Sequence, residues 1–130
     1  MYSQTTRNVK ITVTPVYLDE QSDPEEHHYV WAYTVLLENI GEEKVQLINR
    51  YWHITDATGA IQEVRGAGVV GEQPVLKSGD VFQYTSGAAL RTPSGIMSGE
   101  YEMETDFQER FLVKIPAFSL DSPDQMKRPN

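Results

Sequence analysis

Hydrophobic residues recur at every second position in two well-separated segments of the chain. In the first segment, Val9, Ile11 and Val13 alternate with polar residues. In the second, one apolar series alternates with one largely acidic series: Met97, Gly99, Tyr101 and Met103 against Ser98, Glu100, Glu102 and Glu104. A period of two is typical of a β-strand with one buried face and one solvated face. Because no segment longer than about ten residues has a helical period, these patterns predict an all-β protein.

Turn signals divide the rest of the chain into further short strands. The predicted strands are residues 8–18, 28–38, 44–56, 60–64, 81–85, 97–104 and 110–115. Segment 28–38 carries aromatic and β-branched residues on both faces, so we expect a central strand covered on both sides. We also expect it to form a hairpin with segment 44–56. About seven strands predict an antiparallel β-sandwich of immunoglobulin or fibronectin type III-like character, and a closed barrel is the alternative.

The length and composition of the chain are those of one folded domain. It has 130 residues, of which 39% are hydrophobic, and it contains no cysteine. It can therefore bury a core without disulfides, and it has no thiolate for catalysis or for binding metal. We expect one domain over residues 1–118, followed by a flexible polar tail over residues 119–130.

The charge of the chain argues against two classes of partner. Nineteen acidic and eleven basic residues give a formal net charge of −8, which repels phosphate backbones and anionic membranes. We therefore expect no nucleic acid and no membrane as partner. The polar start of the chain has no signal-peptide character, and no span of about 20 apolar residues occurs, which favours a cytoplasmic location.

The residue pattern offers no catalytic equipment and no cofactor site. The sequence has no Gly-x-Ser-x-Gly elbow, no thiol and no serine placed beside a histidine, so we predict that the protein is not an enzyme. His27 and His28 lie near acidic residues, but neighbouring residues of a strand point to opposite faces, so we assign no metal ligand. The glutamates at 100, 102 and 104 are spaced too evenly to wrap a cation and indicate a solvated face.

A glycine-rich segment spells the G-x-G-x-x-G pattern of dinucleotide-binding loops with Gly66, Gly68 and Gly71. That reading needs a helix after the second glycine, and Gln73-Pro74 would stop such a helix within one turn. We therefore expect a loop over residues 65–71 between two strands. Two interpretations remain: a nest of backbone amides that binds an anion beside Arg65, or a structural turn that needs positive φ.

A second loop is expected over residues 86–95 and includes Thr92, Pro93, Ser94 and Gly95. Loops at the ends of a sandwich are where recognition usually occurs. We therefore predict that these four residues, together with the glycine-rich loop, form a surface that contacts a partner.

Five blocks of the sequence, in order, closely resemble the bacterial ApaG (CorD) family. They are HYVWAYTVLLEN at 28–39, RYWHITD at 50–56, VRGAGVVGEQP at 64–74, YTSG at 84–87 and TPSGIMSGEY at 92–101. The resemblance implies a fibronectin type III-like sandwich and an association with cobalt tolerance and magnesium efflux. It also implies a gene neighbourhood shared with a diadenosine tetraphosphate hydrolase. Similar domains occur in eukaryotic F-box substrate adaptors and in a polymerase-delta-interacting protein.

These lines of argument lead to one functional hypothesis and one alternative. The hypothesis is a non-catalytic binding module for an as yet unidentified protein partner. The alternative is a module that binds a nucleotide polyphosphate or another phosphate-rich small molecule through residues 66–71. No catalytic residue is carried over from the family.

Overall fold

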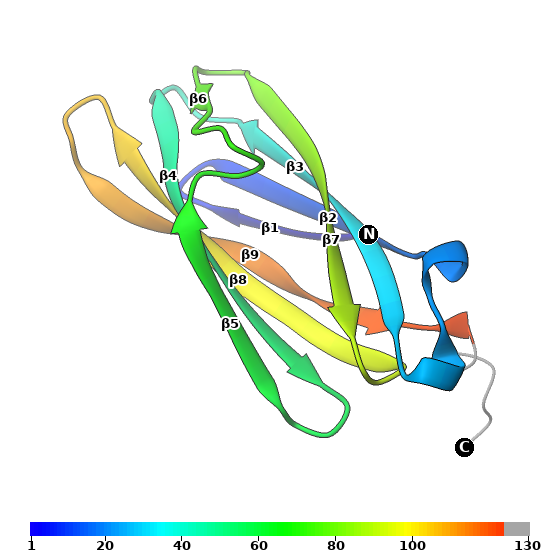
Figure 1. The fold of residues 1–130 in the computed structure, drawn as a ribbon. Helices are drawn as coiled ribbons and strands as arrows, with labels where there is room; N and C mark the ends of the chain where they lie inside the picture. Colours follow the sequence, from blue (N-terminus) through cyan, green and yellow to red (C-terminus); the bar gives the residue numbers. More distant parts are fainter. Residues whose placement is uncertain (124–130) are drawn as a thin grey trace.

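Two antiparallel sheets pack face to face in the computed structural model of this chain, which describes residues 1–123 (Figure 1). One sheet has the strand order β1-β2-β3-β7, and the other has the order β5-β4-β8-β9 with β6 paired to β4. The nine strands of the described residues are β1 (Tyr2–Thr6), β2 (Val9–Tyr17), β3 (Tyr29–Asn39), β4 (Val45–Asp56), β5 (Ile61–Ala67), β6 (Val75–Leu76), β7 (Val81–Leu90), β8 (Ser94–Thr105) and β9 (Arg110–Asp121). The predicted all-β sandwich is confirmed, with two more strands than expected.

The core lies between the two inner faces and follows the period-two pattern. Val9, Ile11 and Val13 of β2 are buried, as are Met97, Tyr101 and Met103 of β8. An aromatic cluster joins the sheets, because the ring of Trp52 in β4 lies 5.2 Å from that of Tyr33 and 6.0 Å from that of Phe118. The alternation read from the sequence therefore identified the buried face of both strands correctly.

The expected hairpin between segments 28–38 and 44–56 is wrong. β3 pairs with β2 and β7, whereas β4 pairs with β5, β6 and β8 in the opposite sheet. Residues 40–44 therefore cross from one sheet to the other. Asn39 holds this crossing, because its Nδ2 donates hydrogen bonds to the carbonyls of Glu43 and Leu76. Local turn chemistry does not distinguish a hairpin from such a crossing, since both need a short polar connection.

Several predicted strand boundaries are also corrected. β3 is central in its sheet, but its residues alternate between buried and half-buried, so only one face is fully covered. The segment with Ser86 and Gly87 continues β7 to Leu90, and Ser94 and Gly95 already belong to β8. β1 was not expected because it is almost entirely polar. The connection between β2 and β3 contains two short 3-10 turns, η1 (Asp19–Gln21) and η2 (Pro24–Glu26).

The C-terminal strand is longer than the sequence suggested. β9 continues to Asp121, whose carbonyl accepts a hydrogen bond from the indole nitrogen of Trp31 at 3.0 Å. Residues 119–121 of the expected tail therefore lie in the sheet, and residues 124–130 of that tail lie outside the described residues.

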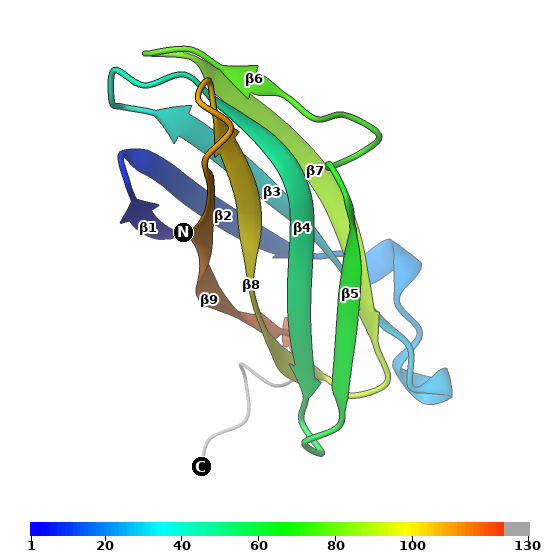
Figure 2. The ribbon, with the colours of Figure 1, turned by 90° about the vertical axis from the view of Figure 1, so that its left-hand side faces the viewer.

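The two sides of the sandwich differ. Figure 2 shows β1 beside β9 at one side, whereas β5 and β7, each the last strand of its sheet, lie at the other. At the first side β9 packs against β1 and β2, and the backbone N–H of Lys114 donates to the Thr6 hydroxyl at 3.3 Å. At the second side no strand pairing joins β5 to β7 in the described residues. One side of the sandwich is therefore closed and the other is open.

Candidate functional site

The glycine-rich segment is a strand end followed by a tight turn. Arg65 and Gly66, expected in a loop, belong to β5. Beyond them, the N–H of Val69 donates to the carbonyl of Glu72 and the N–H of Glu72 donates back to that of Val69, at 2.8 and 2.9 Å. Between these residues φ is positive at both Val70 and Gly71, 44° and 81°. This is the geometry of a two-residue hairpin turn, and a β-branched residue at positive φ is strained there.

Gly68 is required for two separate reasons. Its φ is +64°, in the left-handed region that favours glycine, and an added Cβ would lie 2.3 Å from the carbonyl oxygen of Glu72. Its N–H donates to the carbonyl of Ile48 at 2.9 Å. The backbone N–H groups of residues 68, 69 and 72 are therefore already engaged within the protein.

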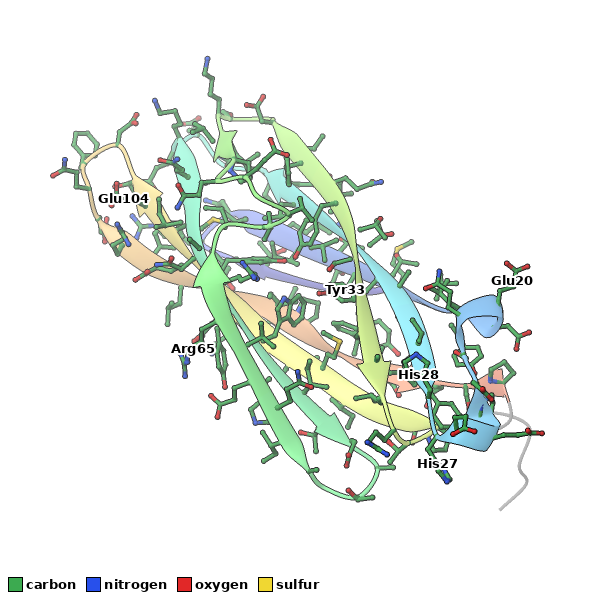
Figure 3. All side chains as sticks on the ribbon, in the orientation of Figure 1. Glu20, His27, His28, Tyr33, Arg65 and Glu104 are labelled. Carbon is green, nitrogen blue, oxygen red and sulfur yellow. The ribbon has the colours of Figure 1, made fainter. Side chains whose placement is uncertain are left out.

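Arg65 lies away from this turn, on the outer face of the five-stranded sheet (Figure 3). Its guanidinium stacks 4.3 Å from the ring centre of Tyr51 and pairs with the Glu63 carboxylate at 3.3 Å. The side chain expected to serve an anion at the glycine loop therefore contacts other partners.

Arg50 of β4, which was not singled out from the sequence, is the arginine beside the glycine turn. Its Nη1 donates to the carbonyls of Ala67 and Gly68 at 3.0 and 2.9 Å. Arg50 forms no ion pair with a carboxylate of residues 1–123. Because the carbonyls are neutral, they leave the positive charge of the guanidinium uncompensated.

A β-bulge explains why Arg50 faces inward. The register of β4 against β8 shifts between Leu47 and Asn49. Before the shift the buried residues, Val45 and Leu47, have odd numbers; after it the buried residues, Trp52 and Ile54, have even numbers. Even-numbered residues therefore face inward after the bulge, and Arg50 lies on the inner side with Trp52. Bulges commonly re-aim a side chain in this way, and the parity change is visible in the sequence.

Along the open side of the sandwich, a groove runs between β5 and β7. It consists of two adjoining hollows of about 330 and 240 Å³ that share Tyr33, Arg50, Trp52 and Ser86 as lining residues. We call it the edge groove. Gln62 and Val64 of β5 and Gly87 to Ala89 of β7 line one hollow, and the glycine turn closes the other. Among the described residues that line the two hollows, Arg50 alone is charged.

Tyrosine hydroxyls lie at and below the edge groove. Burial raises the pKa of Tyr33, and a hydrogen bond with Ser86 opposes that shift. Deeper in the core, the hydroxyls of Tyr84 in β7 and Tyr101 in β8 are 2.5 Å apart and join the two sheets. Burial raises the pKa of both tyrosines well above the usual value, so both are neutral at physiological pH.

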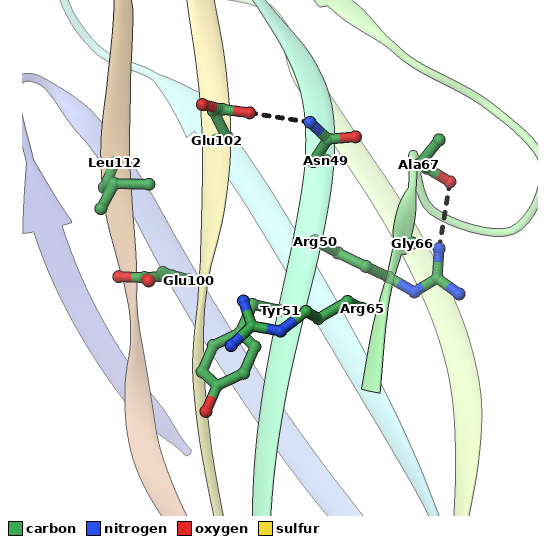
Figure 4. A pocket seen from close by; sticks show the side chains of 9 residues that line it. All are labelled: Asn49, Arg50, Tyr51, Arg65, Gly66, Ala67, Glu100, Glu102 and Leu112. Atoms are coloured by element: carbon green, nitrogen blue, oxygen red, sulfur yellow. Dashed lines mark hydrogen bonds between the residues drawn. The ribbon is translucent and has the colours of Figure 1, made fainter. Parts of the chain in front are cut away.

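Another hollow, separate from the edge groove and of about 490 Å³, lies on the outer face of the five-stranded sheet (Figure 4). Arg50 lines this hollow too, and the other charged side chains that line it are neutralised by close partners: Arg65 by Glu63, Glu100 by Lys114 at 3.0 Å, and Glu102 by Arg110 at 3.2 Å. Asn49 also donates to Glu102 at 2.7 Å. Apart from Arg50, the charges of this surface are already paired, and its glutamates Glu100 and Glu102 make it less suited to an anionic ligand than the edge groove, which has no acidic lining residue.

The predicted partner surface at Thr92, Pro93, Ser94 and Gly95 is partly committed to internal contacts. The Thr92 hydroxyl accepts from the N–H of Ala57 and donates to the carbonyl of Ser94. Gly95 is buried, and an added Cβ would lie 2.5 Å from a Leu90 methyl. Thr92, Pro93 and Ser94 are half-buried; Thr92 and Pro93 lie in the bend that follows β7, and Ser94 begins β8. Their contact with a partner stays a prediction.

Metal-binding side chains do not gather in the part of the chain that the structure describes. Within residues 1–123 no group of three or more His, Asp or Glu side chains could hold a metal ion. His27 is the C-cap of η2, with φ of 53°, whereas His28 forms a bridge with Asp23 (Figure 3). Glu104 pairs with Arg110 at 2.5 Å, so all three glutamates of β8 have a cationic partner. None of the helical segments described is long and apolar enough to span a membrane.

The fold and the edge groove define a two-sheet β-sandwich domain that is open along one side. Residues 19–105 match the family model described as ApaG domain, and the chain belongs to the ApaG family. It is 59% identical to Protein ApaG of Paramagnetospirillum magneticum and 60% identical to Protein ApaG of Rhodospirillum centenum, in each case over 100% of both chains. The resemblance read from the sequence is therefore confirmed.

A solved structure supports the same assignment. The crystal structure of a Bordetella pertussis protein described as ApaA has a TM-score of 0.85 and 46% sequence identity to this chain. The match covers 94% of this chain and 96% of that one.

Proposed function

We propose that this domain is a non-catalytic binding module for a protein partner, and that the edge groove and the glycine turn at its end form the contact surface. One observation carries the proposal: Arg50, which pairs with no carboxylate of residues 1–123, lines a groove that also contains Tyr33 and Trp52. Arginine and aromatic residues are enriched where proteins bind one another. An association with cobalt tolerance and magnesium efflux would then act through the partner.

The test is chemical crosslinking of the full chain to proteins captured from a bacterial lysate. We expect crosslinks to map to the groove, the glycine turn and the segment from Thr92 to Ser94. Arg50→Gln should reduce capture, whereas the matched variant Arg65→Gln should not, because Arg65 is already paired on the outer face. Crosslinks concentrated on Glu100, Glu102 and Glu104 would show that the contact surface is elsewhere.

The alternative is binding of a nucleotide polyphosphate through Arg65, Gly66, Gly68 and Gly71, and one observation favours it. The Arg50 guanidinium ends beside the glycine turn, where it would supply a positive charge. Against it, the N–H groups of Gly68, Val69 and Glu72 already have acceptors, and the net charge of −8 repels polyanions.

We therefore expect ATP and diadenosine tetraphosphate to bind more weakly than about 1 mM in a calorimetric titration. Arg65→Glu should leave the result unchanged, since that side chain lies on the other face. A saturable isotherm tighter than this limit, lost in Arg50→Gln, would establish the nucleotide site instead.

A further inference from the structure

Strand β7 presents a long unprotected edge. It pairs with β3 on one side, and no strand of the described residues pairs with its other side. Its ten residues, VFQYTSGAAL, include no charged residue and no proline. Charges, prolines and covering segments are the means by which proteins keep a sheet edge from pairing with another chain.

The other edges of the sandwich carry such protection. β9 has Arg110, Lys114 and Pro116 along its length, and β5 has Glu63 and Arg65 within seven residues. β1 has only five residues, and β9 packs against it. Among the edge strands of the described residues, the absence of protection is therefore specific to β7, the end strand of its sheet (Figure 2), whose residues line the edge groove.

The inward-facing residues of β7 connect its edge to the groove. Ser86 lies in both hollows together with Arg50, and Ala88 lines the larger one. Small side chains at these positions leave room beside them for side chains from an added strand. A strand that pairs with β7 would therefore direct alternate side chains into the edge groove, toward Arg50.

We infer that β7 accepts an extended segment of a partner protein as an additional strand, and that this segment inserts a carboxylate side chain to pair with Arg50. The inference rests on the proposed function, since it names the kind of partner segment that the groove would bind. Backbone hydrogen bonds to the β7 edge supply affinity, and the ion pair in the groove supplies specificity. The expected segment carries one Asp or Glu among uncharged residues, because the net charge of −8 disfavours a strongly acidic segment.

A second copy of this chain fits the groove less well. If two β7 strands paired edge to edge, neither could offer a carboxylate to Arg50, because residues 81–90 contain no Asp or Glu. The uncompensated guanidinium would then be buried without an anion, which is costly. Charge complementarity therefore favours a partner segment over self-association.

The probe for this inference is a displayed library of random heptapeptides selected on the full chain. We expect the selected peptides to share one Asp or Glu flanked by β-branched residues. The Asp-to-Asn or Glu-to-Gln form of the best peptide should bind about tenfold more weakly or worse. On the protein, Arg50→Gln should give a similar loss, Arg50→Lys a smaller one, and Arg65→Gln none.

N-methylated peptides test strand addition without changing the protein. In an extended peptide alternate N–H groups face the same edge, so methylation of odd residues and of even residues should differ. One series should abolish binding and the other should leave it within about twofold. Equal effects of both series, binding unchanged in Arg50→Gln, or a library that yields no binder would overturn the inference. Capture of a partner protein unaffected by Arg50→Gln would overturn it and leave the binding-module proposal standing.

Sedimentation equilibrium tests self-association through the same edge. If the chain forms a dimer that mutation of β7 dissociates but the selected peptide does not, the edge serves self-association and the inference is overturned.

Discussion

Gly68 and Gly71 both have positive φ, yet they tolerate a methyl group differently. At Gly68 an added Cβ would clash with the Glu72 carbonyl, whereas at Gly71 no atom of the described residues lies within 4 Å of an added Cβ. We therefore expect Gly68→Ala to lower the free energy of unfolding by roughly 3 kcal/mol and Gly71→Ala by about 1 kcal/mol. Urea unfolding of both variants measures the difference. Equal losses would show that the backbone of the turn relaxes around Gly68.

At the scale of elements, the Tyr84–Tyr101 hydroxyl pair links β7 to β8 and makes stability depend on pH. Burial raises both pKa values in the folded state, so the neutral forms are favoured there and ionise more readily in the unfolded chain. This contribution is therefore fully present below the unfolded pKa of about 10 and is lost as pH rises through the folded pKa. The loss should be on the order of 1 kcal/mol per pH unit for each tyrosine.

Denaturant unfolding between pH 8 and pH 11 tests this expectation. The Tyr84→Phe/Tyr101→Phe double variant should lose less stability over this range than the native chain, although it lacks the hydrogen bond between the sheets. An identical pH dependence in the two proteins would contradict the assignment and place the titrating groups elsewhere.

For the whole molecule, the distribution of charge bears on metal binding. The acidic residues of β8 are paired with Arg110 and Lys114, and residues 1–123 hold no group of three metal-binding side chains. We therefore expect Co²⁺ and Mg²⁺ to bind more weakly than about 100 μM in calorimetry, with no change in a His27→Ala/His28→Ala variant. A stoichiometric micromolar Co²⁺ site would contradict this and would support direct metal handling.

Most of the fold was predictable from the sequence because strand formation depends on a local pattern. Alternation in residues 9–14 and 97–104 identified two strands and their buried faces, and turn residues separated the others. Strand ends were less predictable, since β7 runs through Ser86 and Gly87, residues typical of turns. Pairing with β3 keeps them extended, and no local signal reports that partner.

The candidate site was less predictable than the fold. The glycine turn was identified, but Arg65 was assigned to it, whereas Arg50, fifteen positions earlier in the chain, supplies the charge. The bulge after Leu47 reverses which residues of β4 face inward. The sequence contained a signal for this bulge, because the hydrophobic residues change from odd to even positions between Leu47 and Trp52. The environment that Arg50 then meets on the inner side depends on the opposite sheet.

The sequence alone determined the class of the fold, the buried faces of two strands and the family, because each follows from local periodicity or from matched blocks of residues. Only the tertiary structure decided which strands share a sheet, which side of the sandwich is open, and that Arg50, Tyr33 and Ser86 line the same groove there. These relations join residues far apart in the chain, and the packing of two sheets, not the turn between β3 and β4, places them together.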